Sequence, residues 1–155
     1  MKSPWTVAAR VVLLAYVIFL AWVLLRPTPE HASSVVGRVT EELLAAGAPE
    51  VLVAGARVEF GLNALMFAPL PFLGALAFPR VGWGEWVAWA FIGSMAAELY
   101  QGALLPGRSA QFVDIVANTL GGLIGSLAAI PLKWMTGAYR RPRDRHGVEH
   151  QSLRH

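Results

Sequence analysis

Long apolar runs separated by short polar stretches organise this chain. Each run is long enough to cross a bilayer, whose hydrocarbon core of about 30 Å needs roughly 20 apolar residues per helix. The runs cover residues 5–25, 58–78, 83–105 and 112–134. They do not alternate between apolar and polar positions, as the strands of a membrane barrel do. We therefore predict an all-α membrane protein, a bundle of about four transmembrane helices, because a helix satisfies its own backbone groups in lipid.

The segments between and beside these runs complete the predicted organisation. Residues 1–135 form the transmembrane domain, and residues 136–155 form a basic tail that we expect to be disordered and cytoplasmic. The first run is longer than the 7–15 residues of a cleavable signal core, so we interpret it as an uncleaved first span. Two prolines at positions 69 and 71 predict a kink or a break in the second span.

The linker between the first two spans carries apolar residues at helical spacing. Val35, Val36, Val39 and Leu43 recur with charged residues between them, which indicates a short amphipathic helix lying on the membrane surface. A solvated helix that packs on the other spans is an equally good interpretation. At the start of the third span, tryptophans are crowded as in an interfacial aromatic belt: Trp83, Trp86 and Trp89.

Composition and charge narrow the class further. Apolar residues make up 55% of the chain and charged residues 15%, against about 45–50% and 25% in soluble domains. With no cysteine, thiol catalysis and thiolate metal sites are excluded. No phosphate-binding loop, Ser/His/Asp group or metal-ligand spacing stands out, so we expect no metal and no cofactor. The excess of positive charge gathers near the C-terminus, so we expect contact with the bilayer rather than with nucleic acid.

The basic residues also predict the orientation. Four spans place both termini on one side, and this side carries twice as many Lys and Arg as the other. The first side holds Lys2, Arg80 and six residues from Lys133 onward, and the second holds Arg26, Arg38, Arg57 and Arg108. We therefore expect both termini in the cytoplasm.

A few polar residues lie inside or beside the apolar runs. Charged groups in hydrocarbon are costly, by roughly 2.5–3.5 kcal/mol each on insertion scales, and are functional candidates. The candidate binding residues are Asn63, Glu98, Gln101, Arg108, Asp114 and Asn118. With the predicted topology and a rise of about 1.5 Å per residue, all lie within roughly 10 Å of the outer interface. A buried network that only fixes helix register is the structural alternative.

The faces of the helices support this convergence. Glu98 and Gln101 share a face with Ser94, and Asp114 shares a face with Asn118. The same face continues through Gly121 and Gly125, whose spacing lets helix backbones approach closely. We therefore predict that the packing face of the fourth span is also its polar face, and that Arg108 neutralises Glu98 or Asp114.

These residues carry a resemblance to a known family. Segments 63–73 (NALMFAPLPFL), 98–101 (ELYQ) and 108–125 (RSAQFVDIVANTLGGLIG) together resemble the VanZ-like family of bacterial integral membrane proteins. The family is named for a protein linked to resistance to the glycopeptide teicoplanin. The resemblance implies a multi-pass protein of the bacterial cell membrane in which these polar residues form a site, and it offers a link to glycopeptide antibiotics as one possibility.

Three functions stay open at this point. The first is an outward-facing pocket that binds an envelope lipid headgroup or an antibiotic, with Arg108 on an anionic group. The second is a membrane-embedded enzyme in which Glu98 and Asp114 act as acid and base, although no nucleophile or metal is evident. The third is a structural subunit of a membrane complex, with the face of Gly121 and Gly125 as its contact with a partner. The sequence does not determine the oligomeric state.

Overall fold

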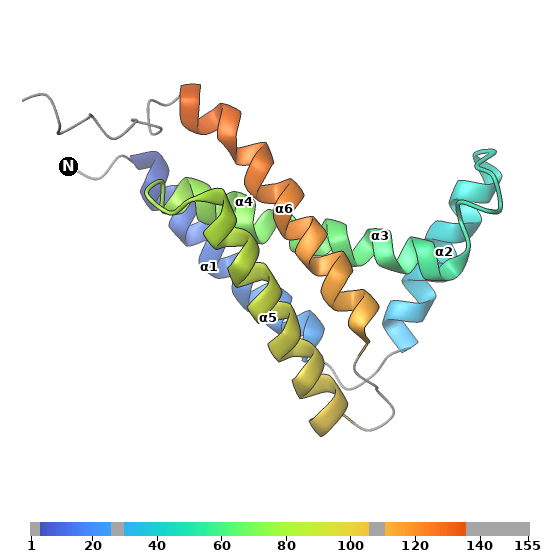
Figure 1. The fold of residues 1–155 in the computed structure, drawn as a ribbon. Coiled ribbons are helices and arrows are strands. Elements are labelled where there is room, and N and C mark those ends of the chain that lie inside the picture. The colour runs from blue at the N-terminus through green and yellow to red at the C-terminus, as the bar shows by residue number, and fades with distance from the viewer. Residues whose placement is uncertain (1–3, 26–29, 106–110, 136–155) are drawn as a thin grey trace, which may run out of the picture.

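The protein folds into helices joined by short connections (Figure 1). The computed structural model describes residues 4–25, 30–105 and 111–135. Within these ranges there are six helices and no strand. They are α1 (Pro4–Leu24), α2 (Glu30–Ala45), α3 (Gly55–Phe67), α4 (Pro69–Ala77), α5 (Trp83–Leu104) and α6 (Phe112–Met135). The all-helical prediction is confirmed for this part of the chain, while Lys2, Arg108 and the tail 136–155 lie outside it.

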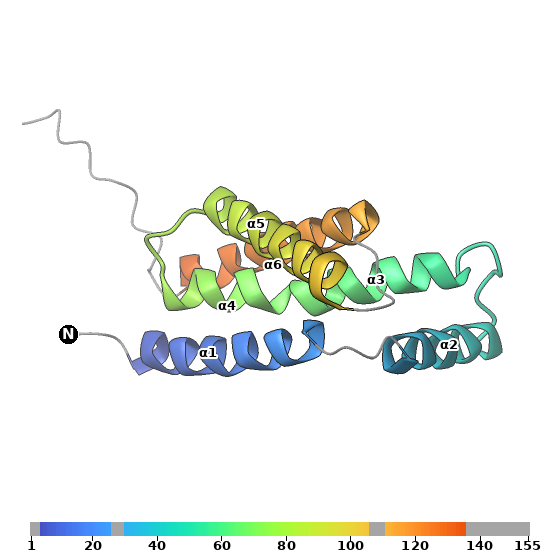
Figure 2. The ribbon, with the colours of Figure 1, turned by 90° about the horizontal axis from the view of Figure 1, so that it is seen from below.

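The helices form three layers (Figure 2). Helices α1 and α2 lie in one outer layer, α3 and α4 in the middle layer, and α5 and α6 in the other outer layer. Helix α6 packs against α3, α4 and α5. Helix α1 packs on α4 and α2 packs on α3, so the middle layer contacts both outer layers.

Three segments are long and apolar enough to cross a membrane, which is fewer than the four spans expected from the sequence. They are Pro4–Leu24, Gly55–Ala77 and Phe112–Met135. Helix α5 has 22 residues, the length of a span, but it contains Glu85, Glu98 and Gln101. These polar residues lower its mean hydropathy below that of the other three segments.

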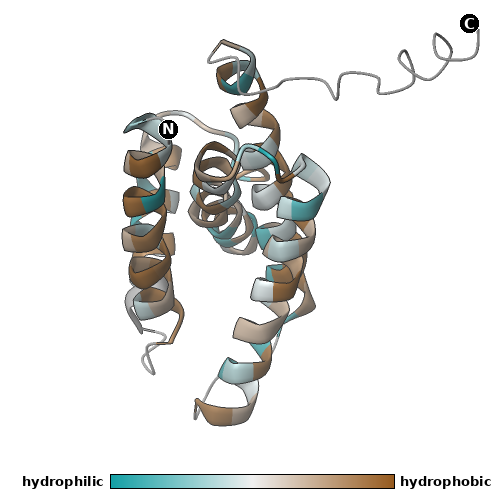
Figure 3. Ribbon diagram, turned by 90° about the vertical axis from the view of Figure 1, so that its left-hand side faces the viewer, coloured by the Kyte–Doolittle hydropathy of each residue, from teal (hydrophilic) through white to brown (hydrophobic). Residues whose placement is uncertain are grey.

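Helix α1 exposes apolar side chains around most of its surface. Leu20 is its one buried residue, while residues such as Val11, Leu14 and Ile18 are exposed. In Figure 3, α1 is the mostly brown helix that begins beside the N label. A soluble protein rarely exposes so large a contiguous apolar surface, whereas lipid covers it without cost.

The second apolar segment is interrupted where its prolines predict. Helix α3 ends at Phe67 and α4 begins at Pro69, with Ala68 between them. Ala68 keeps helical dihedral angles, and its amide still donates to the Ala64 carbonyl at 3.0 Å. Pro69 occupies the first position of a helix, where its missing N–H is tolerated.

Close packing of α6 on α3 depends on two glycines. A Cβ at Gly121 would overlap the backbone carbonyl oxygen of Ala64, and a Cβ at Gly125 would overlap that of Ala68. Both glycines are buried, so their Cα atoms pack directly against the backbone of α3 and of Ala68, the residue that follows α3. The predicted packing face is therefore used for contacts between helices of this chain.

Candidate functional site

The polar residues of three helices meet at the end of the bundle where α6 begins. Asn63 of α3 donates a hydrogen bond from Nδ2 to Oδ1 of Asp114 in α6, with a length of 2.8 Å. Both side chains are half-buried. Because the two residues are 51 positions apart, this contact depends on α3 and α6 crossing at that depth. The convergence predicted for these two residues therefore occurs.

Glu98 of α5 reaches the same helix start from another side. Its carboxylate oxygen Oε2 accepts the backbone N–H of Gln111 at 2.7 Å, and the side chain is only 5% exposed. Gln111 directly precedes α6, where backbone N–H groups have no partner within the helix. A carboxylate is favoured there, because the helix dipole places partial positive charge at this end. Glu98 thus contacts the residue that precedes α6, and Asp114 belongs to the first turn of this helix.

A fully buried polar pair lies one turn further along α6. Asn118 donates from Nδ2 to the hydroxyl oxygen of Ser94 in α5, with a length of 2.8 Å. Asn118 is 4% exposed and Ser94 is completely buried. The oxygen Oδ1 of Asn118 has no hydrogen-bond partner within the described residues. A buried amide oxygen that lacks a donor is costly, so it indicates a place for a hydroxyl, an ammonium group or a water molecule.

Gln101 contacts a different helix from the other predicted site residues. Its Nε2 donates to the backbone carbonyl of Leu24 at 2.9 Å, and its side chain is buried. Leu24 is the last residue of α1, whose terminal carbonyls lack partners within the helix. Gln101 therefore links α5 to the first helix. Arg108, which we predicted to neutralise Glu98 or Asp114, lies outside the described residues.

Two further polar contacts hold α1, and the sequence did not single them out. Tyr16 donates its hydroxyl to the carbonyl of Met66 at 2.6 Å, and Arg10 donates Nε to the carbonyl of Ala77 at 3.1 Å. A tyrosine in the middle of an apolar run was the available signal, because a buried phenol needs a partner. Trp86 also departs from the expected interfacial belt, since its ring packs on Gly74 instead of facing outward.

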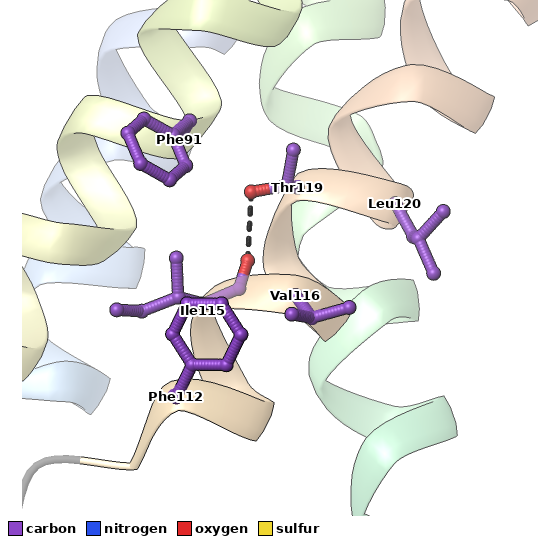
Figure 4. A pocket seen from close by; sticks show the side chains of 6 residues that line it. All are labelled: Phe91, Phe112, Ile115, Val116, Thr119 and Leu120. Atoms are coloured by element: carbon purple, nitrogen blue, oxygen red, sulfur yellow. Dashed lines mark hydrogen bonds between the residues drawn. The ribbon is translucent and has the colours of Figure 1, made fainter.

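An apolar groove of about 280 Å³ lies between α5 and α6 (Figure 4), and none of the predicted polar site residues lines it. Its lining consists of Phe91, Phe112, Ile115, Val116, Thr119 and Leu120. The single hydroxyl of this lining belongs to Thr119 and donates to the Ile115 carbonyl at 2.7 Å. With that hydroxyl occupied, the groove offers apolar contacts and no acid or base.

Apolar helices that bury carboxylates and amides at one end of their bundle define a helical membrane protein with a polar cluster in its interior. Residues 13–134 match the model of the VanZ/LLP1 family, and the chain therefore belongs to this family. The match covers all the motifs that carried the resemblance and confirms it. No curated protein and no solved structure matches the chain.

Proposed function

We propose that this protein crosses the bacterial cell membrane four times and binds the polar headgroup of a cell-envelope lipid in an outward-facing site. The observation that carries the proposal is the hydrogen bond between Asn63 and Asp114, beside the contact of Glu98 with the start of α6. Hydrocarbon does not accept such groups singly, and ionisable residues inside membrane bundles commonly mark ligand or ion sites.

Helix α5 is the fourth crossing in this proposal. Its 22 residues extend for about 33 Å, the thickness of a hydrocarbon core. The polar residues Ser94, Glu98 and Gln101 are buried against neighbouring helices. The side chains that it exposes are mainly apolar and include Trp89, Phe91, Ile92, Met95 and Leu99. A helix with this division meets lipid with an apolar surface even though its mean hydropathy is low.

The orientation rests on the distribution of basic residues. Arg10, Arg80 and Lys133 belong to the end of the bundle that holds the start of α1, and the polar cluster lies at the other end. By the positive-inside rule, the cationic end and both termini are cytoplasmic, and the cluster faces outward. Helix α2, whose apolar residues include Val36 and Val39, would lie along the outer membrane surface beside α3.

The ligand presents both hydrogen-bond donors and an anionic group. The amide donors of Asn63 and Asn118 are used within the protein, whereas Oδ1 of Asn118 still lacks a donor among the described residues. Hydroxyl groups of a headgroup supply such donors. The sequence adds Arg108 as the contact for a phosphate. A headgroup with a phosphate and several hydroxyls satisfies both requirements.

Lipid retention tests this proposal. The full chain is purified from bacterial membranes in a mild detergent, and bound lipid is measured by native mass spectrometry. We expect Glu98→Gln and Asp114→Asn to lose most of the bound lipid. Glu59→Gln is the matched control, because Glu59 is an exposed acid one turn before Asn63 on α3. Wild-type lipid occupancy in both folded site variants would contradict the proposal.

Cysteine labelling tests the orientation. The chain has no cysteine, so Arg108→Cys and Arg80→Cys each introduce a unique thiol. A membrane-impermeant maleimide added to intact cells should label position 108 and leave position 80 unlabelled until the membrane is permeabilised. The reverse pattern would invert the protein and remove the outward-facing site.

Two carboxylates at one helix start also favour a second candidate, an acid–base enzyme acting on an envelope substrate. In that case Glu98→Gln would abolish turnover of the retained lipid while sparing much of its binding. The family resemblance adds a role in glycopeptide resistance. Growth in teicoplanin, compared between the wild type and Arg108→Ala, tests that role directly.

A further inference from the structure

The connection between α4 and α5, residues 78–82, has cations from two other parts of the chain close to it. Arg10 of α1 donates Nε to the carbonyl of Ala77, the last residue of α4. The guanidinium carbon of Arg10 also lies 4.9 Å from the centre of the Phe78 ring. Arg80 belongs to the connection itself and is exposed. The α4–α5 connection therefore has two arginines at it, because Arg10 contacts its start and Arg80 belongs to it.

A third cation approaches this connection from α6. Lys133 is only 5% exposed and donates Nζ to the carbonyl of Val81 at 3.4 Å. Helix α4 packs against both α1 and α6, and Figure 2 shows it between them. The two outer helices thus bring Arg10 and Lys133 to the connection from different sides.

Negative charge is sparse around these cations. Helices α1 and α4 contain no Asp or Glu, and Asp114, the acid of α6, lies at the opposite end of that helix. Helix α5 contributes Glu85 in its first turn, and this carboxylate accepts the N–H of Gly82 at 2.7 Å. Three cations against one acid leave this end of the bundle positively charged.

Exposed tryptophans place this charge at the level of lipid headgroups. Trp5 near the start of α1, Trp83 at the start of α5 and Trp134 near the end of α6 are all exposed. Tryptophans gather where a membrane protein meets the boundary between hydrocarbon and water. The phosphates of the adjacent leaflet are therefore within reach of these cations.

We propose that the α4–α5 connection is a binding site for the phosphate of an anionic phospholipid, held by Arg10 and Arg80 and favoured by the charge of Lys133. The bond to Ala77 uses one of the five N–H donors of the Arg10 guanidinium, and the two Nη groups carry the other four. Arg10 therefore keeps the donors that a bidentate contact with a phosphate needs. This site lies at the end of the bundle opposite the polar cluster and does not depend on the function proposed there.

Lipid-dependent stability tests the site. The full chain in dodecyl maltoside is titrated with phosphatidylglycerol, phosphatidylcholine or inorganic phosphate, and the midpoint of thermal unfolding is recorded. We expect phosphatidylglycerol to raise the midpoint of the wild type. Arg80→Gln and Arg10→Gln should each weaken the apparent affinity for phosphatidylglycerol about fivefold. Because Arg80 is exposed, its variant should fold even if loss of the Ala77 contact impairs Arg10→Gln.

Two controls separate this site from general attraction to charge. Arg38→Gln removes an exposed cation from α2 and should keep the wild-type affinity. Replacing Arg140, Arg141, Arg143 and Arg145 by Gln removes four of the five arginines of the tail, and the effect of Arg80→Gln should persist in that background. Equal stabilisation by phosphatidylcholine or by inorganic phosphate would overturn the proposal. An Arg80→Gln variant with wild-type affinity would overturn it as well.

Discussion

A side-chain hydrogen bond from Asn63 to Asp114 joins α3 to α6, with a length of 2.8 Å. It lies about two turns from Gly121, where α6 packs on the α3 carbonyl of Ala64. The same pair of helices is thus held by a polar contact near its end and by close backbone packing further in. These two contacts make separate predictions.

The Asn63–Asp114 contact should be measurable by a double-mutant cycle. We expect Asn63→Ala, Asp114→Ala and the double variant to give a coupling energy of about 0.6–1.7 kcal/mol, the range of hydrogen bonds between membrane helices. Unfolding by denaturant in mixed micelles provides the free energies. A coupling energy near zero would mean that the two side chains do not stabilise each other.

The glycine contacts should tolerate no side chain. Gly121→Ala places a Cβ on the carbonyl of Ala64, and Gly125→Ala places one on the carbonyl of Ala68, so we expect each to lower the free energy of unfolding by about 1–3 kcal/mol. Gly93→Ala is the control, because a Cβ at Gly93 of α5 meets nothing within 4 Å. This control should be neutral or should stabilise by up to about 1 kcal/mol, as expected from helix propensity. Equal effects at all three positions would refute the close packing.

Gly74 of α4 should likewise tolerate no side chain. A Cβ at this position would overlap the six-membered ring of Trp86, so Gly74→Ala should destabilise by about 1–3 kcal/mol. Adding Trp86→Phe should recover part of the loss, because the smaller ring leaves room for the methyl group. Gly84→Ala, with open space at its Cβ, should leave the thermal midpoint unchanged. The absence of any rescue would argue against this contact.

The hydroxyl of Tyr16 should help to hold α1 on the bundle. Tyr16→Phe removes the donor to the Met66 carbonyl and leaves the ring, so we expect a loss of about 0.5–1.5 kcal/mol. Hydrogen exchange of the α1 amides, followed by mass spectrometry, should become faster. Tyr100→Phe serves as the control, since Tyr100 is exposed on α5. If both variants exchange alike, the hydroxyl of Tyr16 has no role in docking α1.

Much of the fold follows from the one-dimensional pattern. Length and hydropathy of an apolar run predict a helix and its limits, and the break beside Pro69 follows from the missing N–H of proline. Spacing along a helix predicts which side chains share a face, and position within a span predicts depth. For this reason, the contact of Asn63 with Asp114 and the buried state of Glu98 were within reach of the sequence.

The identity of the neighbour at each face was decided by tertiary structure. Gln101 lies in the last turn of α5, near Glu98, but donates to Leu24, because α1 and not α6 occupies that side of α5. Trp86 turns inward, because Gly74 leaves space for its ring on α4. A periodic pattern describes one helix at a time and contains no information on the partner.

The same division between what the sequence predicts and what the tertiary structure decides holds for the protein as a whole. The sequence by itself determined the helical class, the end of the bundle at which the polar residues gather and membership of the VanZ/LLP1 family. Only the tertiary structure decided that Gln101 bonds to α1, that Trp86 packs on Gly74 and that Gly121 packs on the backbone of Ala64. The physical reason is that burial depends on which surfaces meet, and this is a property of several helices together.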